Sequence, residues 1–323
     1  MILGQDRAVE QFASAWTSRK LHHGWLLAGP KGVGKASFAQ AAARRVLSEA
    51  AGPPFDLPAL DSPDEHPIVK LITAGSHPDM RWLKRLPREK GEGLARNISV
   101  EQVRELGEFL TLTPALSPWR VAVIDTVDEL EASAANALLK ILEEPPPNTL
   151  FFLVSHAPGR LLPTVRSRCR RLDFQALSGD AMTSILARDV PELSKTDRDR
   201  IIAMSAGSAG RALAFAELDF GKIEDAAMAI LRHGDPTNAR RSELAAELGK
   251  KNAADRYGAF LDAAPSLIAA QARRVTGEPR ERALVAYAKA RELGAVARRL
   301  SLNPSATVFE MGGILADAAE CLP

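Results

Sequence analysis

The feature that most constrains the fold is a glycine-rich turn between an apolar run and a helix-prone segment. The apolar run covers residues 25–28, and the turn that follows contains Gly29, Gly32, Gly34 and Lys35. This spacing is that of a phosphate-binding loop (P-loop), GxxxxGK and then Ser or Thr, whose backbone N–H groups surround an anion while the lysine reaches the outer phosphates. An ordinary glycine-rich turn is the alternative. Because the sequence indicates both the strand and the helix that the motif requires, it predicts a P-loop fold.

The residue after the lysine departs from this motif. A Ser or Thr hydroxyl at that position ligates Mg²⁺, but this chain has Ala36 there. Ser37 lies one step further on, and one step along a helix turns a side chain by about 100°. We therefore expect the loop to bind the phosphates of ATP or ADP and to be poorly equipped for Mg²⁺, whose binding is left open.

Strands and helices alternate along the first half of the chain. Continuous apolar runs at 120–124 and 150–154 are typical of strands buried on both faces. Such alternation predicts a parallel three-layer α/β sheet, which we assign to a first domain at 1–174. Further strands are expected near 79–86 and 172–174, and helices near 35–48, 100–110 and 133–144.

A carboxylate ends one of the buried strands. Asp125 follows the run at 120–124, and in P-loop ATPases such an aspartate supports Mg²⁺ while the next residue, a glutamate, activates the attacking water. In this chain Thr126 follows instead. The acid two positions further, Asp128, is expected to point elsewhere. The alternative for Asp125 is a strand-end acid that caps the next turn.

The segment 52–78 interrupts the alternation. It holds six prolines and several charges, which predicts an irregular excursion without a helix or strand. His66 and His77 lie within it. Because no cysteine is near to complete a metal site, we expect both histidines at the surface.

Composition limits the class of protein. The 323 residues carry a net charge of +2, so no overall basic field argues for direct nucleic-acid binding. The only cysteines, Cys169 and Cys321, exclude a four-cysteine zinc site and a disulfide framework. The N-terminus has no apolar signal region, and no apolar run approaches 18 residues. We expect a cytoplasmic protein that binds no zinc and no membrane.

The last part of the chain reads as helical. Ser178 is a plausible cap for the first of three short helices, which gives a small helical unit at 175–221. Boundary signals at Gly221 and in the turn at 234–236 precede a longer Ala- and Leu-rich segment. This segment, 222–323, predicts five helices in a self-contained bundle.

Six segments match a known family in its own order. The chain resembles the AAA+ clamp-loader subunits of bacterial DNA polymerase III, well over residues 1 to about 215 and only in general character beyond. The alanine-leucine helix that ends in Leu-Glu-Glu-Pro-Pro and the Ser-Arg-Cys triplet are the most specific parts. The matching segments are Gly4-Gln5, residues 29–35, His77-Pro78-Asp79, the Asp125 strand, residues 134–146 and Ser167-Arg168-Cys169.

This resemblance implies roles for individual residues. Arg168 matches the arginine that such subunits project into the neighbouring subunit's ATP site, the alternative being a structural arginine that bridges a surface carboxylate. Gly4 and Gln5 match the segment that packs against adenine, although a simple helix-cap region is an equal alternative. Ser155 matches the sensor of the γ-phosphate. In the stretch that resembles the second sensor, Gly210 occupies the position of the sensing arginine.

The resemblance also implies an architecture and partners. Residues 175–221 would be the AAA+ lid and 222–323 the collar where subunits join into a ring. The partners would be the motor subunits gamma/tau, the delta subunit, the sliding clamp and, through the assembled complex, primed DNA. Many relatives carry a four-cysteine zinc module in the region of residues 52–78, and its absence leaves that excursion without its usual cross-link.

Three functions follow from the departures at Ala36 and Thr126. The leading hypothesis is a ring subunit of the DNA polymerase III holoenzyme that donates Arg168 and need not hydrolyse ATP by itself. The second is an ATP-hydrolysing motor of the same loader, or another AAA+ ATPase. The third is a nucleotide-binding regulator outside replication.

Overall fold

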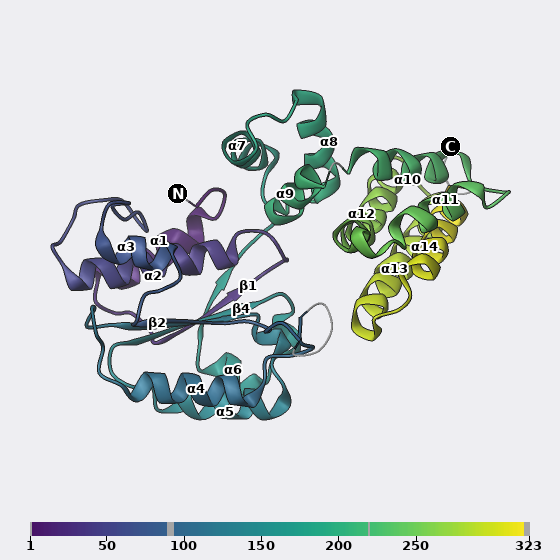
Figure 1. The fold of residues 1–323 in the computed structure, drawn as a ribbon. Helices are drawn as coiled ribbons and strands as arrows, with labels where there is room; N and C mark the ends of the chain where they lie inside the picture. The colour runs from purple at the N-terminus through teal and green to yellow at the C-terminus, as the bar shows by residue number, and fades with distance from the viewer. Residues whose placement is uncertain (1, 89–93, 219, 320–323) are drawn as a thin grey trace. The chain divides into compact units, whose positions relative to one another are not determined.

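The computed structural model describes residues 2–88, 94–218 and 220–319. The chain divides into two compact units, residues 1–177 and 178–323, and we describe each by itself (Figure 1). We call them the N-terminal and the C-terminal unit. Cys321 lies outside the described residues.

The N-terminal unit is built on a parallel sheet. Its described residues form five strands in the order β2-β3-β4-β1-β5, and all neighbouring pairs are parallel. Every residue of β1, β3 and β4 is buried except Asp125, which is why these strands are largely continuous apolar runs. The predicted parallel α/β sheet is confirmed. The strands are β1 (Gly24–Ala28), β2 (Met80–Leu83), β3 (Arg120–Asp125), β4 (Thr149–Ser155) and β5 (Arg170–Asp173).

Helices cover both faces of this sheet, giving the three layers that the sequence predicts (Figure 1). The helices α1, α2 and α3 lie on one face, and α4, α5 and α6 on the other. Their bounds are α1 (Asp6–Thr17), α2 (Lys35–Ala51), α3 (Pro67–Thr73), α4 (Val100–Thr111), α5 (Ala132–Glu143) and α6 (Pro163–Ser167).

The strand pleat divides the core into two clusters. Successive side chains of a strand point to opposite faces, so Trp25 and Leu27 join one cluster with Phe12 of α1. Leu26 joins the other with Leu138 of α5. The rings of Phe12 and Trp25 meet edge to face, with centroids 5.1 Å apart, a geometry that aromatic pairs favour. Both faces of the central strands are therefore fixed by packing.

The excursion at 52–78 is more ordered than the sequence suggests. The prediction of no helix is wrong for Pro67–Thr73, which forms α3. Proline is well suited to the first position of a helix because its missing N–H would have no partner there. The ring of His66 accepts a hydrogen bond from the Ile68 N–H at 3.3 Å, and Ile68 and Ile72 are buried in the core.

Arg45 of α2 connects the excursion to the body of the unit. Its guanidinium donates to the carbonyl oxygens of Leu57 at 2.8 Å and of Asp61 at 3.0 Å. It also forms an ion pair with Glu49 at 2.7 Å and lies 4.8 Å from the ring centroid of Phe55. A buried arginine thus links this segment to α2.

The triplet His77-Pro78-Asp79, just before β2, also holds the loop before β3 in place. The carboxylate of Asp79 accepts the backbone N–H groups of Ala115, Leu116 and Ser117 at 2.6, 2.7 and 2.9 Å. The expectation of a surface His77 is wrong, because this side chain is only 3% exposed. Its Nδ1 accepts the N–H of Asp79 at 3.1 Å, and burial lowers the pKa of His77. The triplet therefore anchors the loop that leads into β3.

The C-terminal unit is helical throughout its described residues. The three short helices predicted after Ser178 and the five predicted from about 222 are all present. Both parts, 175–221 and 222–323, fall mainly within this unit, so their division into lid and collar domains stays a prediction. The helices are α7 (Gly179–Asp189), α8 (Lys195–Ser205), α9 (Ala209–Glu217), α10 (Gly221–His233), α11 (Ala239–Leu248), α12 (Ala254–Ala272), α13 (Glu278–Leu300) and α14 (Pro304–Ala319).

Among the residues that the structure describes, no helix combines the length and the apolar character needed to cross a lipid bilayer.

Candidate functional site

The P-loop connects β1 to α2 and requires glycine at two positions for different reasons. At Gly29 an added Cβ would lie 2.2 Å from the carbonyl oxygen of Phe174. Any side chain there would collide with the main chain that directly follows β5. At Gly34, the N-cap of α2, φ is +100°, a left-handed conformation that glycine adopts at little cost. Gly32 also has a positive φ of 78°. The loop therefore has the shape that the motif predicts, at the positive end of a long helix.

Lys35 lies folded over the loop. Its ammonium donates to the carbonyl oxygen of Gly29 at 2.6 Å and also to that of Pro30, and the residue is only 3% exposed. Burial lowers the pKa of Lys35 to about 8, while the negative charges of Asp128 and Asp125 raise it. A phosphate at this position would add further negative charge, which favours the charged form of the buried amine.

The residues beside the lysine do not fit a magnesium site of the usual kind. Ala36 offers a methyl group where the motif has a hydroxyl, and Ser37 is exposed. Both border a groove of about 520 Å³ that also contacts Trp82 of β2. In the described residues no group of three or more His, Cys, Asp and Glu side chains could hold a metal ion. Ala36 thus removes the side-chain oxygen that this motif offers to Mg²⁺.

Asp125 lies at the end of β3, beside Val154 of β4. Burial raises the pKa of Asp125, whereas a hydrogen bond from Trp82 and the charge of Lys35 lower it. The next residue, Thr126, is 6% exposed, and its hydroxyl has no hydrogen-bond partner within the described part of the chain. No carboxylate therefore occupies the position from which a P-loop ATPase activates water.

Asp128 belongs to the site, so the expectation that it points elsewhere is wrong. The short 3-10 turn Val127–Glu129 bends the chain back, and the Asp128 carboxylate accepts the hydroxyl of Ser155 at 2.8 Å. It also accepts the backbone N–H groups of His156 at 2.5 Å and Ala157 at 3.3 Å. The fully buried Ser155 is thereby held beside the P-loop.

His156 carries no charge at neutral pH. Burial and the positive charge of Lys35 lower the pKa of this imidazole to about 4, while the negative charge of Asp128 raises it. Lys35, Asp128 and Lys31 are the charged groups that act on this imidazole.

Gln5 connects the N-terminus to the P-loop and to the end of the sheet. Its side-chain amide donates to the carbonyl oxygens of Val33 at 3.1 Å and Gln175 at 2.9 Å, and its oxygen accepts the Gln175 N–H at 3.3 Å. The side chain makes no cap hydrogen bond to α1. Gly4, with a φ of 71°, allows the preceding turn. Gln5 thus contacts the P-loop through Val33, and the role of Gly4 and Gln5 at an adenine stays a prediction.

Arg168 lies at the end of the sheet where the strands begin, and the P-loop lies at the other end, where they finish. It directly follows α6 and precedes the first residues of β5, and an added Cβ on Gly24, at the start of β1, would lie 3.1 Å from the Arg168 carbonyl oxygen. The P-loop follows the other end of β1, four residues on, which is about 13 Å at the rise of a strand. The structure therefore keeps Arg168 away from its own chain's P-loop.

The Arg168 guanidinium has partners within its own chain. It forms an ion pair with Glu143, the last residue of α5, at 2.7 Å, and donates to the Thr164 carbonyl oxygen at 3.0 Å. Among its neighbours, Arg170 stacks on Trp25. Burial raises the pKa of the adjacent Cys169 thiol to about 12, so this cysteine is not a reactive one.

The second-sensor stretch lies in the C-terminal unit. Gly210, in the first turn of α9, brings no side chain to the position of the sensing arginine. The adjacent Arg211 donates to the hydroxyl of Ser266 on α12 at 3.2 Å. Its guanidinium is therefore engaged within this unit.

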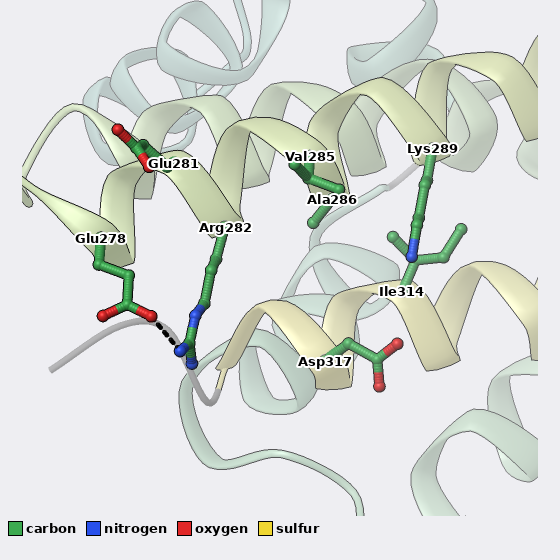
Figure 2. Close-up of a pocket in the computed structure, with 8 residues that line it drawn as sticks. All are labelled: Glu278, Glu281, Arg282, Val285, Ala286, Lys289, Ile314 and Asp317. Carbon is green, nitrogen blue, oxygen red and sulfur yellow. Dashed lines mark hydrogen bonds and ion pairs between the residues drawn. The ribbon is translucent and has the colours of Figure 1, made fainter.

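A groove of about 440 Å³ runs between α13 and α14 in the same unit. Figure 2 shows Glu278 paired with Arg282 along α13, and Lys289 near Ile314 of α14. Charged and apolar side chains line the groove together, and none of the site residues predicted from the sequence is among them. Apart from the second-sensor stretch, the site residues predicted from the sequence lie in the N-terminal unit.

The sheet order, the P-loop after β1 and the acid at the end of β3 define a P-loop domain of the AAA+ class. The model of the family described as "DNA polymerase III, delta subunit" matches residues 4–178, more than half of the chain. The chain belongs to this family, and the resemblance to the clamp-loader subunits of DNA polymerase III is confirmed.

Individual relatives are named for two kinds of subunit. The chain is 35% identical to the delta-prime subunit of Pseudomonas aeruginosa DNA polymerase III over 58% of this chain and 53% of that one. It is 30% identical to the tau subunit of Bacillus subtilis over 79% of this chain and 44% of the other. The chain thus spans about half the length of these curated relatives. A gamma subunit-related protein of Thermotoga maritima aligns with 96% of this chain and 99% of its own, at 18% identity and a TM-score of 0.47.

Proposed function

We propose that this chain is a delta-prime-type subunit of the DNA polymerase III clamp loader that supplies Arg168 to the ATP site of a neighbouring subunit. The observation that carries the proposal is the position of Arg168 at the end of the sheet where the strands begin, away from its own P-loop at the other end. An arginine there is of no use to nucleotide bound by the same domain. It is well placed to reach nucleotide on a domain that packs against this end of the sheet.

The chemistry of such an arginine is established. A guanidinium brings a fixed positive charge and several N–H donors to the phosphate oxygens as charge shifts in the transition state. In other NTPases an arginine supplied by a partner accelerates hydrolysis by roughly 10³–10⁵-fold. Catalysis would then take place on the neighbour's P-loop and metal ion.

The P-loop of this chain is proposed to hold nucleotide rather than to hydrolyse it. Lys35 and the glycines support binding of ATP or ADP, with Gly4 and Gln5 beside the base. Ala36 and Thr126 leave the site without a metal-ligating hydroxyl and a water-activating carboxylate. We therefore expect binding that depends little on Mg²⁺.

The partners in this proposal are the gamma/tau and delta subunits, the sliding clamp and primed DNA, which the assembled ring would join during replication. The Ala-rich C-terminal helices would form the collar. Leu284 and Val285 of α13 are 50% and 56% exposed, which gives this helix apolar surface for other subunits.

The second candidate is an ATP-hydrolysing motor of the gamma/tau type. It is favoured by the intact glycines and Lys35, and by the similarity to tau over 79% of the chain. Its test uses the purified chain alone. Steady ATP turnover that disappears in Lys35→Ala would support the motor, and no turnover would leave the delta-prime-type subunit as the better proposal.

The direct test of the leading proposal is an assembled loader with Arg168→Ala. We expect clamp- and DNA-stimulated ATP hydrolysis to fall by at least tenfold at the one motor site that this subunit completes, because that site loses its arginine. Arg160→Ala is the matched control. Arg160 is also an exposed arginine, but it follows β4 at the end of the sheet that carries the P-loop. Unchanged hydrolysis in Arg168→Ala, with normal assembly, would refute the assignment.

A further inference from the structure

We propose that Glu143 is a positioning residue, which holds the Arg168 guanidinium folded back on its own chain until the phosphates of a neighbouring subunit's nucleotide replace the carboxylate. The proposal deepens the proposed function and rests on it. It adds a second residue to the arginine surface and a step, the exchange of a carboxylate for a phosphate, to the way that surface acts.

The first observation is the geometry of the arginine. Nη2 of Arg168 lies 2.7 Å from Oε1 of Glu143, and Nη1 donates to the Thr164 carbonyl oxygen at 3.0 Å, four residues back along the chain. The side chain therefore turns back over α6 and does not extend from the surface. Reaching a phosphate on another chain requires it to leave both partners.

The second observation is the position of the carboxylate. Glu143 is the last residue of α5, a helix whose Leu138 and Leu142 are buried in the core. Because Pro145 follows closely, the chain cannot continue the helix. The carboxylate is thus carried on a packed element and does not move with the loop that bears Arg168.

The third observation is exposure. The Arg168 and Glu143 side chains are 32% and 47% exposed, so water and salt screen the pair strongly. Exposed ion pairs of this kind change an equilibrium by no more than about fivefold, or about 1 kcal/mol. Several phosphate oxygens at a drier interface form stronger, charge-assisted hydrogen bonds with arginine. The pair is therefore strong enough to order the arginine and weak enough to be displaced.

The test compares Glu143→Gln with Glu144→Gln. Glu144 is the adjacent exposed acid, and the described contacts of Arg168 involve Glu143 alone of the two. In the assembled loader, Glu143→Gln removes an interaction that Arg168 must break before the transition state. We expect kcat/KM for ATP to rise two- to fivefold through a lower KM, with kcat unchanged. Glu144→Gln should leave both constants unchanged, and added salt should reduce the difference between Glu143→Gln and the unaltered protein.

A second measurement does not depend on assembly. In the full chain alone, the ¹⁵Nε signal of Arg168, assigned by its loss in Arg168→Lys, should shift in Glu143→Gln and stay in place in Glu144→Gln. An unshifted signal would overturn the ion pair and with it the proposal, while the Arg168→Ala experiment would still decide the proposed function. A shifted signal with an unchanged or lower kcat/KM would overturn the positioning role.

Discussion

Nucleotide binding at the P-loop should weaken steeply above pH 8 because of Lys35. The buried ammonium has a pKa of about 8 in the folded chain, against 10.5 for a free lysine. Nucleotide phosphates favour the charged form, so binding returns the pKa towards its ordinary value. Above pH 8 the chain must then take up nearly one proton for each nucleotide bound. Affinity should fall by about tenfold between pH 7 and pH 9.

The same shift fixes the sign of a stability effect. The folded pKa is lowered, so between pH 8 and 10.5 the unfolded chain binds more protons than the folded chain does. The stability of the nucleotide-free protein should therefore rise with pH in this window, by about 3 kcal/mol in total from this group. Nucleotide affinity and intrinsic stability thus change in opposite directions, which is a signature that general alkaline damage does not produce.

The assay is calorimetric titration with ADP from pH 7 to 9.5, in two buffers of different ionisation enthalpy so that proton uptake is measured directly. Lys35→Arg is the control, because a guanidinium stays charged throughout this range, and its affinity should not depend on pH. Constant affinity of the unaltered chain, without proton uptake at pH 9, would refute the reasoning about Lys35. Absence of ADP binding at every pH would refute the proposal that the loop holds nucleotide.

Two further predictions concern segments around the site. Asp79→Ala leaves three backbone N–H groups without their carboxylate, and should lower the free energy of unfolding, measured in urea, by about 2–3 kcal/mol. Asp64→Ala, at an exposed position, is the control and should have little effect. An equal effect of both substitutions would contradict the role of Asp79. Arg45→Ala removes the hydrogen bonds to Leu57 and Asp61, and should speed proteolysis within residues 53–66 by roughly tenfold or more. Arg44→Ala is the control on the same helix, because Arg44 binds Thr73 instead.

The sheet could be predicted because its signals are local. The buried runs of β3 and β4 and the glycines after β1 each determine their own backbone, and alternation with helices determines the parallel order. Ser99 and Gln102 form a capping box at the start of α4, which is also a signal within four residues of sequence. Packing then confirms what each segment already favours.

The features that were missed depend on contacts between distant residues. Asp128 could not be assigned to the site from spacing alone, because a single 3-10 turn returns it to Ser155, 27 positions away. The burial of His77 follows from its place beside Asp79 and the loop at 115–117. The helix Pro67–Thr73 was obscured by the surrounding prolines, although its own proline stands where a helix accepts one. The Glu143 partner of Arg168 lies 25 positions upstream, on another element.

The strand β1 connects two surfaces that would belong to different nucleotide sites in a ring. Its first residue, Gly24, lies against the main chain of Arg168 and the sulfur of Cys169, and its last residue leads into the glycines around Lys35. Its neighbours hold it in register on both sides, Ala28 opposite Ser155 and Asp173. A strand paired in this way cannot slide without breaking its hydrogen bonds, so it moves with the sheet as one rigid body. In such a ring, a rotation of this domain that follows nucleotide binding at its own P-loop would displace Arg168 at the adjacent interface by a comparable angle, with β1 as the mechanical link between successive sites.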